Sequence, residues 1–148
     1  MLRIAIFEFV QIATSIYAWR YGGRPERIMA VTLLLAAWIS LGVGVPANRY
    51  LGLDVTQFAI DLLLLCLLLA VAARANRFWP LWVAALHLVA IGFHIVQAVS
   101  PIPERLVYPA LVGEMAYAIC AALAWGTYHY RRRCQGDGVR PLDWSRLR

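Results

Sequence analysis

The sequence contains no lysine and few charged residues of either sign. Only 15% of its 148 residues are charged and 62% are hydrophobic, whereas an ordinary soluble domain is about 25% charged. This composition excludes a typical water-soluble domain. The formal charge of +6 comes from arginine, which stays ionised at any physiological pH. A chain that is both basic and apolar indicates the lipid bilayer as its partner, and we expect no nucleic acid.

Motifs of soluble enzymes and of cofactor sites are also missing. The sequence has no phosphate-binding loop, no dinucleotide fingerprint, no H-E-x-x-H and no G-x-S-x-G. Its three cysteines lack any paired spacing, which argues against a disulfide framework and a zinc site. His87 and His94 share one predicted helix, so a haem held by histidines would need a second chain or another ligand. We therefore favour neither a metal nor a haem, name no catalytic residue and lean against an enzyme.

Five apolar runs are each long enough to cross about 30 Å of hydrocarbon as a helix. They cover residues 2–19, 28–45, 55–73, 78–99 and 106–128. The first run contains Glu8 and Gln11, and no A-x-A pattern precedes Arg20, so we expect a retained helix and not a cleaved signal peptide. The sequence predicts an all-α polytopic membrane protein with a bundle of five transmembrane helices over residues 1–130.

The arginines are distributed unevenly between the two sides of this bundle. If successive connectors alternate between the sides, one side receives Arg3, Arg49 and Arg105. The other side receives the remaining eleven, which are Arg20, Arg24, Arg27, Arg74, Arg77, Arg131, Arg132, Arg133, Arg140, Arg146 and Arg148. By the positive-inside rule, this distribution predicts an outward N-terminus and a cytoplasmic C-terminus.

The tail over residues 131–148 is rich in arginine. We expect four of its residues to contact anionic lipid headgroups, because they combine positive charge with an apolar side chain. These residues are Arg131, Arg132, Arg133 and Trp144. The alternative is a frayed tail that sets the topology and has no specific partner.

Ionisable side chains within membrane spans cost about 2.5–3.5 kcal/mol on insertion scales and usually face the bundle interior. At a rise of about 1.5 Å per residue, four of them lie about 8–13 Å from the outer ends of four different helices. This polar layer consists of Glu8, Asp61, His94 and Glu114, with His87, Gln11, Gln57 and Gln97 as secondary members. Desolvation and like-charge repulsion disfavour several carboxylates in one apolar site, so protonation of the layer would respond to binding or pH.

Two functions are compatible with the polar layer. In the first, its side chains only fix helix packing. The protein is then a small accessory or assembly protein of a membrane complex, and its partner is another membrane protein or a second copy of itself. In the second, the layer is the site of a proton- or ligand-coupled binding or transport protein. The sequence alone favours the accessory role and keeps the coupled site as the alternative.

Two connectors carry a resemblance to known proteins. The segment from Tyr21 to Ile28 reads YGGRPERI, and that from Ala75 to Trp82 reads ANRFWPLW. Together with the helices that carry Asp61 and His87, they resemble a set of short uncharacterised bacterial inner-membrane proteins without an established activity. The resemblance implies a bacterial inner membrane and supplies no mechanism.

The same connectors also have an interpretation in terms of turns and anchors, which we favour. Pro25 suits the first turn of a helix, and the carboxylate of Glu26 suits the positive end of that helix. The aromatic residues of the second connector are typical of anchors at a membrane interface.

Overall fold

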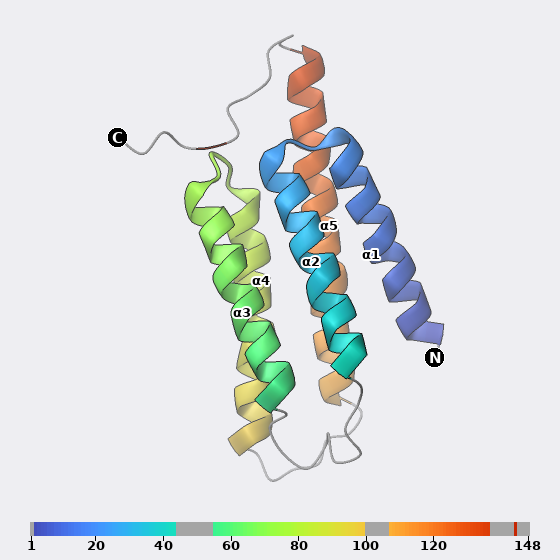
Figure 1. The fold of residues 1–148 in the computed structure, drawn as a ribbon, viewed down its shortest axis with the longest axis vertical. Coiled ribbons are helices and arrows are strands. Elements are labelled where there is room, and N and C mark those ends of the chain that lie inside the picture. The colour runs from blue at the N-terminus through green and yellow to red at the C-terminus, as the bar shows by residue number, and fades with distance from the viewer. Residues whose placement is uncertain (1, 44–54, 100–106, 137–143, 145–148) are drawn as a thin grey trace.

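Five helices make up the described part of the protein. The computed structural model describes residues 2–43, 55–99, 107–136 and 144. In chain order, the helices are α1 (Leu2–Tyr21), α2 (Arg24–Val43), α3 (Val55–Arg74), α4 (Trp79–Val99) and α5 (Val107–Gly136). Successive helices run in opposite directions and pack into one bundle (Figure 1). The predicted all-α fold is confirmed.

Among the described residues, three helical segments are long and apolar enough to cross a membrane. They are α2, α3 and the segment Trp79–Val96 of α4. Large apolar side chains also lie on the outside of the other two helices, where Phe9 on α1 is 74% exposed and Trp125 on α5 is 64% exposed. An apolar surface of this kind is unfavourable in water and typical of contact with lipid or protein. The fold is therefore compatible with a membrane protein.

The turn between α1 and α2 consists of Gly22 and Gly23 alone. The Gly22 amide donates to the Ala18 carbonyl at 2.9 Å. A Cβ atom on Gly22 would lie 2.4 Å from that same carbonyl oxygen, so the close approach requires glycine. Pro25 lies in the first turn of α2, where its missing N–H costs no helical hydrogen bond. As a result, α2 begins at Arg24 and not near residue 28, and Glu26 is part of a helix.

The buried core joins side chains from several helices. Met29 on α2, Leu68 on α3 and Leu123 on α5 are at most 1% exposed. The α5 helix contacts α1, α2 and α4. It approaches α4 closely at Gly126, where a Cβ atom would lie 2.4 Å from the Trp79 ring. Glycine at this position allows the helix backbone to pack directly on an indole.

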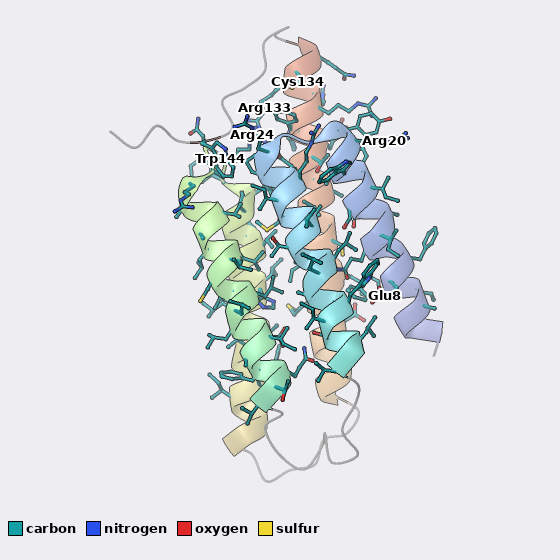
Figure 2. All side chains as sticks on the ribbon, viewed as in Figure 1. Glu8, Arg20, Arg24, Arg133, Cys134 and Trp144 are labelled. Carbon is teal, nitrogen blue, oxygen red and sulfur yellow. The ribbon has the colours of Figure 1, made fainter. Side chains whose placement is uncertain are left out.

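Arginine side chains gather at one end of the bundle. Figure 2 shows Arg20, Arg24 and Arg133 at the end where Trp144 also lies, whereas Glu8 lies toward the opposite end. We call the first of these the arginine-rich end. It contains the α1–α2 turn, the α3–α4 connector and the last turns of α5. Because α5 continues to Gly136, the three arginines at positions 131–133 lie in its last turns.

Candidate functional site

Asp61 and His94 form a side-chain pair between α3 and α4. The His94 Nε2 atom lies 2.9 Å from the Asp61 Oδ2 atom. The His94 side chain is 8% exposed and the Asp61 side chain 18%. This separation is typical of a hydrogen bond between a ring nitrogen and a carboxylate oxygen. Both residues belong to the polar layer predicted from the sequence, and the structure brings them into direct contact.

Gln57 connects this pair to α2. Its Nε2 atom donates to the Ser40 Oγ atom at 3.0 Å and to the Asp61 Oδ2 atom at 3.4 Å. Gln57 and Asp61 lie one turn apart on the same face of α3, which places the amide beside the carboxylate. Ser40 is a member that the sequence did not indicate, because a single hydroxyl in an apolar run gives no sign of which neighbour it faces.

His87 contacts the backbone of the same residue. Its Nε2 atom lies 2.9 Å from the Asp61 carbonyl oxygen, and its side chain is buried. A carbonyl oxygen only accepts hydrogen bonds, so this contact requires the proton on Nε2. His87 and His94 are two helical turns apart, and both face α3. Ser40, Gln57, Asp61, His87 and His94 together form what we call the Asp61 cluster.

The remaining carboxylates of the predicted layer lie on α1 and α5. Glu8 is half-buried on α1 (Figure 2), and the Glu114 side chain is exposed on α5. The rings of Phe7 and Tyr117 meet edge to face, with their centroids 5.6 Å apart. Because each glutamate lies within one turn of one of these rings, Glu8 and Glu114 are at a similar level of the α1–α5 interface. The predicted layer is thus divided between two helix pairs.

The secondary member Gln11 contacts the backbone of α2. Its side chain is buried, and its Nε2 atom donates to the Leu33 carbonyl oxygen at 2.8 Å. This hydrogen bond fastens α1 to the backbone of α2. The side chain of Gln97 lies outside the described residues.

A second buried polar cluster lies at the arginine-rich end, around Glu26. This carboxylate is completely buried. Its Oε1 atom accepts hydrogen bonds from the Arg77 guanidinium and, at 3.1 Å, from the Trp79 Nε1 atom. Its Oε2 atom accepts from the Gly23 amide at 3.0 Å. The Arg77 guanidinium also stacks over the Tyr130 ring of α5 at 4.3 Å. We call these five residues the Glu26 cluster.

The Glu26 cluster was missed by the sequence analysis. Glu26 was interpreted as a carboxylate at a helix start, which the Gly23 contact bears out. The hydrogen bonds to Arg77 and Trp79 were not expected. The available signal was that both connectors were assigned to the same side of the membrane, and that the first contains a carboxylate, Glu26, whereas the second contains only arginines as charged residues. A fully buried carboxylate needs this many donors, because its desolvation is otherwise very unfavourable.

The four residues predicted to contact lipid headgroups lie at the arginine-rich end. Arg131, Arg132 and Arg133 are exposed on the last turns of α5. The Arg131 guanidinium lies over the Tyr21 ring at 4.3 Å, which ties α5 to the end of α1. Trp144 is half-buried and forms an antiparallel backbone bridge with Ala75. Its position against the α3–α4 connector differs from a frayed tail, and the contact of these residues with lipid stays a prediction.

In the described ranges, no three His, Cys, Asp or Glu side chains are arranged to hold a metal ion. The Asp61 cluster brings a carboxylate and an imidazole into contact, and the Glu26 cluster fastens the ends of helices. Searches of protein-family models, of curated proteins and of solved structures found no match to this chain.

Proposed function

We propose that all five helices cross a bacterial inner membrane, with the N-terminus outside and the arginine-rich end in the cytoplasm. Three helical segments support this by their length and hydropathy. For α1, the support is that Gln11 and Ser15 are buried in the bundle whereas Phe9 and Ile16 are exposed. A fluorescent protein fused after Arg148 should fold and fluoresce, whereas alkaline phosphatase fused there should be inactive. The reverse pattern would overturn the orientation.

We propose further that the Asp61 cluster is a reversible proton-binding site, and that the protein is a proton-coupled binding or transport protein. The observation that carries this proposal is the 2.9 Å contact between His94 Nε2 and Asp61 Oδ2 in the interior of the bundle. A carboxylate beside a neutral imidazole has a net charge of −1, and one added proton makes the pair neutral. Because net charge is unfavourable at membrane depth, uptake of the proton depends on which other charges are bound nearby.

The cluster also provides a route from protonation to helix packing. Gln57 donates to Asp61 and to Ser40, so it joins the titrating carboxylate on α3 to the neighbouring helix α2. A hydrogen bond to an ionised acceptor is about twice as strong as one between neutral groups. A change in the charge of the pair therefore alters the contact that holds α2 against α3.

Nitrogen NMR of protein labelled with ¹⁵N-histidine in lipid micelles tests the proton site directly. The ring nitrogens of His94 should change with pH in the native sequence. At a fixed acidic pH, Asp61→Asn should lower the protonated fraction of His94, because the anion that stabilises the imidazolium is gone. His87→Gln and His94→Gln assign the signals, and Glu8→Gln is the matched control that removes a carboxyl from α1. A His94 signal that is unchanged by Asp61→Asn would leave the cluster as a packing element only.

A second candidate function is an accessory role in a membrane complex, which the position of Glu114 favours. This carboxylate is exposed on α5 at the level of the half-buried Glu8, although charged side chains in membranes usually face protein. A partner helix, from another protein or a second copy, would cover this face. Native mass spectrometry of gently extracted protein should then show a partner that Glu114→Gln weakens and Asp61→Asn leaves in place. A native chain that carries no partner would contradict the accessory role.

A further inference from the structure

A groove lies on the surface of the bundle at the arginine-rich end. It encloses about 340 Å³ between the end of α1 and the first half of α2, which is at the low end of the range for ligand sites. It is lined by Trp19, Arg24, Arg27, Ile28, Val31 and Thr32. Trp19, Ile28 and Val31 are large apolar side chains that nevertheless stay exposed. The groove is thus an open apolar surface with two guanidinium groups at one end.

One of the two arginines is held in place by the protein. The Arg27 Nε atom donates to the Gly22 carbonyl at 3.2 Å. Its guanidinium carbon lies 5.9 Å from the centre of the Trp19 ring, within the range of a cation–π contact. The bond to Gly22 uses one N–H group, and a guanidinium has five. The other N–H groups of Arg27 can therefore donate to an anion, and Arg24 lies three residues before Arg27 on the same helix.

The order of these residues along α2 matches the order of chemical groups in a phospholipid. Arg24 and Arg27 are in the first turn of the helix, at the arginine-rich end. Ile28 and Val31 follow toward the middle of the bundle, so that Val31 lies about 10 Å farther along the axis than Arg24. An occupant must place a negative charge at the helix end and an apolar chain along the helix. Arginine binds phosphate by paired N–H contacts, which makes phosphate the fitting anion.

We propose that the α1–α2 groove binds one anionic phospholipid, with its phosphate on Arg24 and Arg27 and an acyl chain against Ile28 and Val31. This site is separate from the headgroup contacts expected for the end of α5. It depends on the membrane location proposed above and is independent of proton binding by the Asp61 cluster. Phosphatidylglycerol has a net charge of −1, whereas the choline cation makes phosphatidylcholine neutral and would lie beside the two guanidinium groups. We therefore expect phosphatidylglycerol to bind and phosphatidylcholine with the same chains not to bind.

Native mass spectrometry of delipidated protein, titrated with each of these two lipids in detergent, tests the site. The first phosphatidylglycerol should be retained preferentially, and each lost arginine should weaken its binding by about fivefold. Arg24→Gln keeps the Arg27–Gly22 bond and so preserves the turn. Arg20→Gln is the matched control, because it removes one charge from the same end of the bundle at a residue that does not line the groove. Val31→Trp fills the groove without changing the charge and should also reduce retention.

Several outcomes would overturn the proposal. Equal retention of the two lipids would remove the role of charge. Equal weakening by Arg20→Gln would indicate general attraction to the arginine-rich end and no defined site. Displacement of the lipid by millimolar inorganic phosphate, with no effect of Val31→Trp, would identify a free-anion site. A protein bound over the groove in place of lipid would identify a protein interface.

Discussion

Glu26 and Arg77 form a buried ion pair although they are 51 positions apart in the chain. The pair joins the start of α2 to the connector that precedes α4, and Tyr130 of α5 stacks on the guanidinium. It therefore holds three helix ends together at the arginine-rich end. Arg77 is buried and is not part of the charged surface. Without it, ten arginines remain on the predicted cytoplasmic side against three on the other side. The orientation predicted by the positive-inside rule therefore does not depend on Arg77.

Replacing Glu26 should strongly destabilise the bundle. Glu26→Gln keeps the shape of the side chain but leaves Arg77 buried without its counterion, and such losses cost about 3–5 kcal/mol in free energy of unfolding. The double change Glu26→Met with Arg77→Met removes both charges and should cost less than Glu26→Gln alone. Reversible unfolding in mixed micelles, followed by circular dichroism, measures both variants. If the double change is as costly as the single one, the charge on Arg77 is not the cause.

Gly126 should not tolerate even alanine. A Cβ atom there would lie 2.4 Å from the Trp79 ring, and overpacking of this kind costs about 1–3 kcal/mol. Gly92→Ala on α4 is the matched control, since no atom lies within 4 Å of its added Cβ. Alanine is the better helix former by about 1 kcal/mol, so the control should be neutral or stabilising. Thermal unfolding of the two variants in the same detergent gives the comparison, and equal midpoints would contradict the close approach.

The five helices could be predicted from the sequence because apolar runs of this length leave few alternatives to a helix. The first turn of α2 lies before the apolar run, but Pro25 and Glu26 were interpreted as a helix start, and α2 does begin at Arg24. Their helical state depends on the Gly22–Gly23 turn and on the partners that Glu26 finds. The pairing of Glu26 with Arg77 depends on how two connectors meet in space. A hydropathy profile contains no information about that contact.

The sequence predicted the level of the candidate site along the helices, but it did not predict which side chains face each other. The rise per residue of an α-helix, counted from the predicted helix ends, places Asp61 and His94 at one level. The structure shows that these two side chains also face each other on neighbouring helices. The same calculation placed Glu8 and Glu114 at that level, but these residues lie on α1 and α5. Which helix neighbours which is decided by packing of the core, and a single sequence does not specify it. Depth alone therefore overestimates how many side chains share a site.

Gln57 should couple α2 to the Asp61 cluster through its contact with Ser40. We expect Gln57→Leu to lower the free energy of unfolding by about 0.6–1.7 kcal/mol, the range found for polar contacts between membrane helices. Ser40→Ala removes the other side of the same hydrogen bond. If the contact is real, the double variant should cost less than the sum of the two single variants. Strict additivity in mixed-micelle unfolding would show that the two side chains do not interact.

The backbone bridge between Ala75 and Trp144 should be detectable as a cross-link. Residues opposite each other in an antiparallel pair have Cα atoms about 4.5–5.5 Å apart, and disulfides need about 4.4–6.8 Å. Ala75→Cys with Trp144→Cys, in a chain whose native Cys66, Cys120 and Cys134 are replaced by alanine, should therefore oxidise readily. Glu8→Cys with Trp144→Cys is the control, because Glu8 lies toward the opposite end of the bundle (Figure 2). Mass spectrometry after proteolysis identifies the linked peptides. Equal yields for the two pairs would mean that Trp144 is not docked on the α3–α4 connector, and the frayed tail would then be the better description.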